Sequence, residues 1–156
     1  MARYAEGATV EVLSSRLEIE RMIAKHGGGD VLAGTLSGKA FVQFRMKSRW
    51  VRLSVPTPTI NDPRVQRGPN GGHRTEAQKK TAIDGELRRR WRALVLLVKA
   101  KFAAIDDGVT QFEEEFLAHV IIDQNRTVYD VMRENIDQHY ITGQPLALPS
   151  PDGLHK

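Results

Sequence analysis

Alternating apolar and polar residues mark two adjoining strands in the middle of the chain. Over residues 39–55 the alternation runs through two segments on either side of Lys47 and Ser48, a spacing typical of a two-residue β-turn. The apolar residues of both segments fall on one face, which predicts a core face. Pairing across the turn places three couples on the other face: Arg45 with Trp50, Gln43 with Arg52, and Phe41 with Ser54.

The hydrophobic pattern before this hairpin predicts the rest of a sheet layer. Residues 9–13 alternate as a strand does, and residues 16–26 have the helical period before three glycines that end it. A further strand at residues 31–36 leads into a two-residue turn at 37–38. Residues 1–56 are therefore predicted to form a β-α-β-β-β layer with an antiparallel sheet.

The second half of the chain has the period of helices. Prolines, glycines and arginines over residues 57–74 predict a flexible basic loop without a regular element. Residues 75–142 follow as a helical part that packs on the sheet within one domain, and residues 143–156 are predicted to be a loose tail.

Three threonines at capping positions divide the helical part. Thr75 starts a long basic helix, while Thr110 and Thr127 start two shorter ones. Within the long helix, residues 93–98 are apolar around the whole circumference, so we expect burial on more than one side. The predicted fold class is α+β: a β-α-β-β-β antiparallel sheet layer followed by a long basic helix and two shorter helices.

Composition narrows the partners and the compartment. The 156 residues carry a formal charge of +4, which favours nucleic acid or another acidic partner. The chain has no cysteine, which excludes disulfides and thiol chemistry and fits a reducing compartment. The longest apolar run is too short to span a bilayer, and the N-terminus lacks the pattern of a signal peptide. We therefore expect a cytoplasmic protein without a membrane partner.

The mixed cations and aromatics of the central hairpin are the first candidate binding site. Phe41 and Trp50 offer rings on which a base can stack, and Arg45 and Arg52 offer charge for phosphates. The alternative is that the long helix covers this face and the arginines lie at its rim with buried stems.

A second candidate lies on the long helix, where Arg88, Arg89 and Arg92 follow one another at positions that could track a phosphate backbone. A cationic amphipathic helix also suits a membrane surface, or it can be a solvated side whose arginines pair with the acids at residues 113–115. These alternatives stay open at the level of the sequence.

The chain shows no catalytic motif, so we expect neither an enzyme nor a cofactor. Neither glycine-rich stretch, at residues 27–29 or 71–72, has the Gly-Lys-Ser/Thr of a phosphate loop, and no nucleophile elbow is present. Glu115 and His119 stand four residues apart and are a weak metal candidate, because no further ligand pattern completes a site. We expect no metal.

Three segments carry a resemblance to a known group. With Arg-Tyr-Ala-Glu-Gly at residues 3–7, a basic segment at 90–94 and Phe-Glu-Glu-Glu-Phe-Leu-Ala-His at 112–119, the chain resembles a group of small bacteriophage and prophage proteins for which no activity is established. The resemblance implies a phage or prophage product that acts in the bacterial cytoplasm.

Together these observations predict a non-enzymatic phage or prophage protein that binds nucleic acid. We expect DNA rather than RNA, in single-stranded form, in an accessory role in replication or recombination. The alternative is a protein-interaction module, such as a phage inhibitor of a host defence system or a self-assembling structural protein. Its partner would be a host protein or a second copy of the chain.

Overall fold

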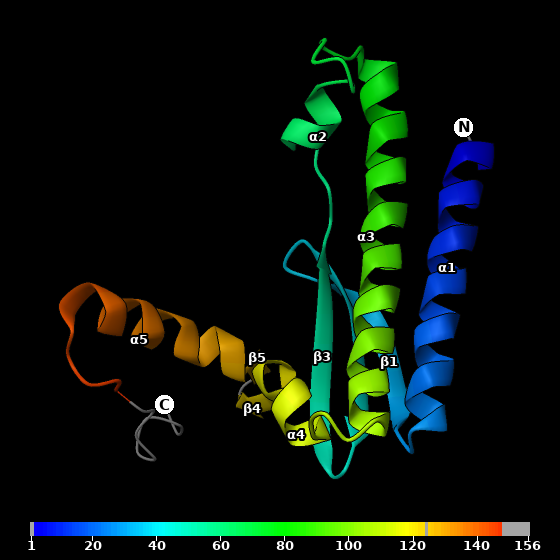
Figure 1. Cartoon of the computed structure of the whole chain (residues 1–156). Helices are drawn as coiled ribbons and strands as arrows, with labels where there is room; N and C mark the ends of the chain where they lie inside the picture. The colour runs from blue at the N-terminus through cyan, green and yellow to red at the C-terminus, as the bar shows by residue number, and fades with distance from the viewer. Residues whose placement is uncertain (1, 124, 148–156) are drawn as a thin grey trace.

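The computed structural model of the protein describes residues 2–123 and 125–147 (Figure 1). Three antiparallel strands form the main sheet, and two long helices pack against one of its faces. This arrangement confirms the α+β class and the order of a sheet layer, a long helix and shorter helices. The elements in chain order are α1 (Ala2–Lys25), β1 (Gly29–Leu36), β2 (Lys39–Met46), β3 (Arg49–Pro56), α2 (Pro63–Gln66), α3 (Glu76–Asp106), α4 (Phe112–Glu115), η1 (Leu117–His119), β4 (Ile121–Asp123), β5 (Arg126–Thr127) and α5 (Val128–Thr142).

The first helix is longer than the sequence indicated. Residues 9–13, predicted as a strand, belong to α1, so the sheet layer is α-β-β-β rather than β-α-β-β-β. The short alternation of Val10 and Val12 also fits a helix, because Val12 continues the stripe of Ile19 and Ile23 that packs in the core. Five residues carry too little periodicity to choose between the two structures, and the packing against the core decided the outcome.

The register of the central hairpin is the one that the alternation predicted. Arg45 lies opposite Trp50, and the other two predicted couples follow along β2 and β3. Both two-residue turns, at residues 37–38 and 47–48, have a positive φ at each position. That conformation lets a hairpin turn follow the natural twist of its strands. The turns therefore fix which side chains share a face of the sheet.

One face of the sheet makes the core with α1 and α3. The side chains of residues 93–98 are buried on one side only, because Leu96 and Leu97 remain 57% and 45% exposed. The expectation that this run is buried on more than one side is therefore wrong. The core residues that face one another are Val42, Phe44, Val51 and Leu53 on the sheet, Ile19 and Ile23 on α1, and Trp91, Leu94, Val95, Val98 and Phe102 on α3.

The segment between β3 and α3 is attached to α3 through a buried carboxylate. One helical turn, α2, lies within residues 57–74, where no regular element was predicted. Glu86 of α3 is only 4% exposed, and its carboxylate lies 3.2 Å from the guanidinium groups of Arg64 and Arg90. Val65 of α2 is fully buried. These contacts hold α2 beside the first half of α3 (Figure 1).

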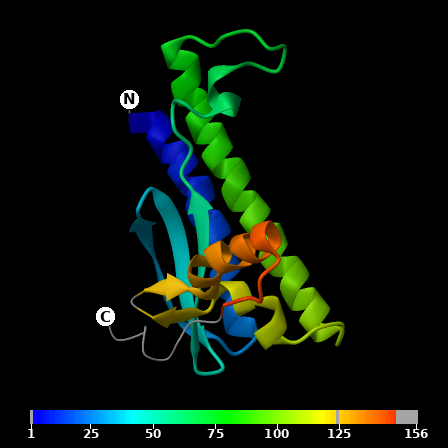
Figure 2. The ribbon, with the colours of Figure 1, turned by 90° about the vertical axis from the view of Figure 1, so that its left-hand side faces the viewer.

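The C-terminal part differs most from expectation. Thr75 and Thr127 cap α3 and α5 as predicted, whereas Thr110 caps nothing, and α4 is a single turn. The β4–β5 hairpin was not predicted. From there α5 leads away from the main sheet (Figures 1 and 2). None of its side chains is buried. Of the tail predicted over residues 143–156, residues 148–156 lie outside the described part.

Candidate functional site

The face of the main sheet opposite the core holds the predicted couples, and we call it the mixed face. α1 and α3 pack on the other side, so the alternative that the long helix covers the mixed face is wrong. The β4–β5 hairpin and the start of α5 lie in front of part of it (Figure 2). By strand register the mixed face comprises Leu32, Leu36, Lys39, Phe41, Gln43, Arg45, Trp50, Arg52 and Ser54.

The two predicted aromatic residues are both partly exposed. Phe41 and Trp50 are half-buried, and Arg45 beside Trp50 is exposed. Gly34 lies opposite Phe41, and a Cβ atom there would come within 3.2 Å of the phenyl ring. The ring therefore lies over the glycine, a cross-strand arrangement in which an aromatic side chain shields backbone that has no side chain of its own.

Arg52 is a buried cation held by neutral oxygens. Its side chain is 7% exposed and donates to Oε1 of Gln43 at 3.0 and 3.2 Å and to the carbonyl oxygen of Asn125 at 2.8 Å. It also donates to the side-chain oxygen of Asn125. The guanidinium lies 5.4 Å from the centroid of the Phe41 ring. Because neutral acceptors fix its position without cancelling its charge, Arg52 gives the mixed face a rigid positive centre.

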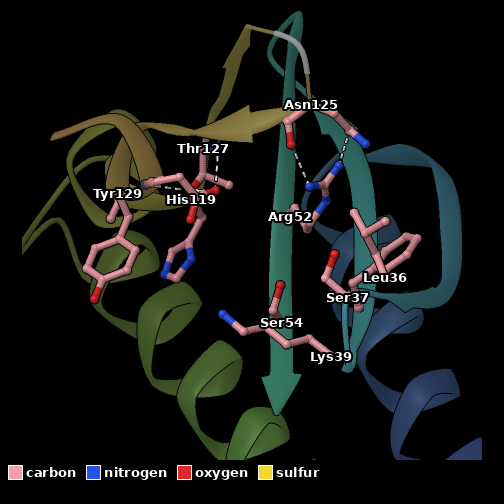
Figure 3. Close-up of a pocket in the computed structure, with 12 residues that line it drawn as sticks. Leu36, Ser37, Lys39, Arg52, Ser54, His119, Asn125, Thr127 and Tyr129 are labelled. Carbon is pink, nitrogen blue, oxygen red and sulfur yellow. Dashed lines mark hydrogen bonds between the residues drawn. The ribbon is translucent and has the colours of Figure 1, made fainter. Parts of the chain in front are cut away.

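A groove of about 470 Å³ opens where the mixed face meets the C-terminal part (Figure 3). Lys39 and Ser54 of the sheet lie on one side of it, and His119 and Tyr129 lie on the other. Arg52 and Asn125 close one end. A volume of this order accommodates one small polar organic group. The lining residues are Leu36, Ser37, Lys39, Phe41, Arg52, Ser54, Ala118, His119, Asn125, Thr127, Tyr129 and Asp130.

The titratable groups of the groove are tuned by their neighbours. The backbone N–H of Thr127 is the main reason why the pKa of Asp130 is lowered; the Thr127 hydroxyl and the charges of Lys39 and Arg52 add to it. Burial lowers the pKa of His119, and the nearby Lys101 lowers it further. At neutral pH the groove therefore combines two cations, one carboxylate and a neutral imidazole, which leaves it with net positive charge.

The arginines of α3 are not part of this surface. Arg88 lies 3.2 Å from Glu11 and Arg92 lies 2.6 Å from Glu18, so both connect α3 to α1. Arg89 pairs with Glu86 on its own helix. Since α3 packs against the core face, these side chains and the mixed face lie on opposite sides of the sheet. The structure therefore does not bring the two predicted sets of residues together on one surface.

The acids that were expected to neutralise those arginines have other partners. Glu113 lies 3.7 Å from Lys47 and 3.4 Å from Arg49, at the tip of the central hairpin. Glu115 lies 3.0 Å from the ammonium group of Lys101. The alternative of a solvated side was therefore right that the arginines of α3 pair with acids. It was wrong about which acids, because the partners are Glu11, Glu18 and Glu86.

The metal candidate gains no further ligand. Glu115 is engaged by Lys101, and His119 belongs to the short η1 turn rather than to a continuous helix with Glu115. Within residues 2–123 and 125–147, no group of three or more side chains that could hold a metal ion lies together.

Sequence reasoning missed the C-terminal half of the groove. Asn125 and Thr127 line the groove from the β4–β5 hairpin, which the hydrophobic pattern did not reveal, and Asp130 lines it from the first turn of α5. One signal was available, since the capping spacing of Thr127 and Asp130 is visible in the sequence and is satisfied in the structure. That signal locates a helix start but says nothing about the strand that it approaches.

Comparison of the chain with protein-family models, with curated proteins and with solved structures found no match. In the described part of the chain, none of the helices is both long enough and apolar enough to cross a membrane.

Proposed function

We propose that the protein is a non-enzymatic binder of single-stranded nucleic acid, and that the mixed face with its groove is the contact surface. One observation carries the proposal: two partly exposed aromatic residues, Phe41 and Trp50, lie next to cations on a sheet face that α1 and α3 leave uncovered. In the phage setting that the sequence resemblance implies, the expected polymer is DNA, in an accessory role in replication or recombination.

The charges of the mixed face are available to phosphates. None of the ion pairs among the described residues involves Lys39, Arg45 or Arg52. Lys39 and Arg45 are exposed, so they can meet a phosphate without breaking an internal contact. Arg52 acts from a fixed position beside Phe41. This supports a surface where charge and stacking work together, as in single-strand binding sheets.

The spacing of the rings suits a strand that crosses the sheet. Trp50 lies opposite Arg45, which is four residues from Phe41 along β2. Four residues of strand span about 13 Å, so the two rings lie under different nucleotides of one strand. Bases stacked on rings in this way are bound with little regard to sequence, because every base has a flat face. The groove beyond Phe41 can then receive one base or phosphate.

A titration of a labelled oligonucleotide tests the proposal. Trp50→Ala and Phe41→Ala should each weaken binding by roughly 5- to 150-fold, which corresponds to the loss of about 1 to 3 kcal/mol of base stacking. Circular dichroism and thermal melting show whether each variant is folded. The same titration with duplex DNA and with single-stranded RNA ranks the polymers.

Arg92→Ala is the matched control, because Arg92 lies on the opposite side of the sheet and pairs with Glu18. It should leave oligonucleotide affinity unchanged. Unchanged affinity in folded Trp50→Ala and Phe41→Ala would remove the stacking mechanism. A loss in Arg92→Ala that equals the loss in those variants would place the contact surface elsewhere.

A further inference from the structure

The outer side of α3 is apolar although it faces away from the sheet. The core side of the helix is formed by Trp91, Leu94 and Val98, which are buried against the sheet. On the other side, Leu96 and Leu97 are 57% and 45% exposed, and the alanines next to them are also open to solvent. A surface helix of a globular protein normally has one apolar side, so the second one calls for a partner.

On the outer side of α3 the intervals between neighbouring positions follow the same order from either end of the helix. Six positions lie along one stripe, at intervals of four, three, four, three and four residues. Such intervals keep side chains on one side of an α-helix over several turns. All six side chains are exposed. The outer stripe consists of Arg89, Ala93, Leu96, Ala100, Ala103 and Asp107.

A symmetric stripe suits an antiparallel copy of itself. If two such helices pair antiparallel with Val98 at the centre, Leu96 of each lies over Ala100 of the other. Ala93 then lies over Ala103. A leucine meets an alanine in one pair and two alanines meet in the other, which lets the two helices approach closely. A parallel pair would instead place leucine over leucine and arginine over arginine.

Charge selects the same arrangement. In the antiparallel register Arg89 of each copy faces Asp107 of the other. Arg89 is 70% exposed in the single chain, and its partner Glu86 is shared with Arg64 and Arg90. Asp107 is the exposed C-cap of α3 and keeps helical backbone angles, so the stripe extends to it. In this register an Arg89–Asp107 ion pair between the two copies would thus form at each end of the apolar stripe.

We propose that the protein forms a two-fold symmetric homodimer in which the α3 helices pair antiparallel along the outer stripe. Neighbouring α1 also exposes Val10, Leu13 and Leu17, which add apolar surface beside the pair. The interface is isologous, because the same stripe serves both copies. Since α3 lies on the core side of the sheet, the dimer leaves both mixed faces accessible. The inference does not depend on the proposed nucleic-acid binding.

Light scattering coupled to gel filtration gives the first test. The full chain should elute as a dimer with twice the 17.5 kDa mass of one chain. Leu96→Glu should halve that mass without changing the circular dichroism spectrum. Leu32→Glu is the matched control, because Leu32 is 54% exposed but lies on the mixed face, and this variant should remain dimeric. A monomeric parent chain at its highest soluble concentration overturns the proposal.

Disulfide trapping tests the register, since the chain has no cysteine of its own. Ala93→Cys and Ala103→Cys should each stay uncrosslinked alone and should form a covalent dimer when mixed and oxidised. Arg89→Glu and Asp107→Lys should each weaken the dimer, and the double variant should restore it. Crosslinking of either cysteine variant alone, or a double variant weaker than both single ones, overturns the antiparallel register.

Discussion

Replacing Arg45 with alanine isolates the electrostatic part of the proposed binding. The side chain is exposed and takes part in none of the ion pairs of the described residues, so the substitution removes a charge and almost nothing else. A surface change of this kind alters the free energy of unfolding by no more than about 0.5 kcal/mol. Any effect on oligonucleotide affinity therefore reports on binding rather than on folding.

The number of cations on the mixed face sets the expected salt dependence of oligonucleotide affinity. Three cations of the mixed face, Lys39, Arg45 and Arg52, take part in none of the ion pairs of the described residues. For single strands each phosphate contact contributes about −0.7 to the slope of log affinity against log salt. Three contacts give a slope of about −2 and two give about −1.4. Between about 50 and 200 mM salt, the parent should thus lose roughly 18-fold in affinity, and Arg45→Ala roughly 7-fold.

Fluorescence anisotropy with a short labelled oligonucleotide at several salt concentrations measures both slopes. Arg92→Ala is the control for a general loss of charge, because the pair of Arg92 with Glu18 lies on the other side of the sheet. Its slope should match that of the parent. A parent slope near zero, or an Arg45→Ala slope equal to the parent's, would refute the reasoning that the mixed face meets phosphates.

Two further predictions concern the parts that support the site. Glu86→Gln removes the charge of a buried carboxylate that pairs with three arginines. It should lower the free energy of unfolding by about 1 to 2 kcal/mol in urea titrations, a modest loss because the arginines can turn to water instead. It should also speed proteolysis within residues 57–74, because Arg64 of α2 loses its contact with α3. The lowered pKa of Asp130 means that its contribution to α5 is complete above the ordinary aspartate pKa and is lost as pH falls through the lowered value. Hydrogen exchange in α5 should therefore rise on acidification in the parent, and Asp130→Ala should show the fast exchange already at neutral pH.

The central part of the fold follows from local information. Two-residue turns and strict alternation leave one register for β2 and β3, so the couples across residues 47–48 could be assigned before the structure. The start of α1 could not, because residues 9–13 fit both periods and only packing against Ile19 and Ile23 favours the helix. β4 and β5 have three and two residues, too few for any pattern to be visible.

The candidate site also has one part that the sequence predicts and another part that it does not. Phe41, Arg45, Trp50 and Arg52 share a face by register, and that much is readable from the sequence. The contact of Arg52 with Asn125 joins residues 73 positions apart, and no local pattern encodes it. The arginines of α3 illustrate the opposite error. Helical spacing shows where they lie around the helix, but it does not reveal which face of the sheet the helix will cover.

The two proposed contact surfaces lie on opposite sides of the molecule, so an experiment can refute either proposal without refuting the other. The outer stripe of α3 lies beyond the core side of the sheet, while Phe41 and Trp50 lie on the mixed face. In a dimer joined through α3 the two mixed faces point away from each other, so one short oligonucleotide contacts one face only. Its affinity should then be the same for the dimer and for the Leu96→Glu monomer. A longer strand that reaches both faces gains from the second contact through effective concentration, and that gain requires the dimer.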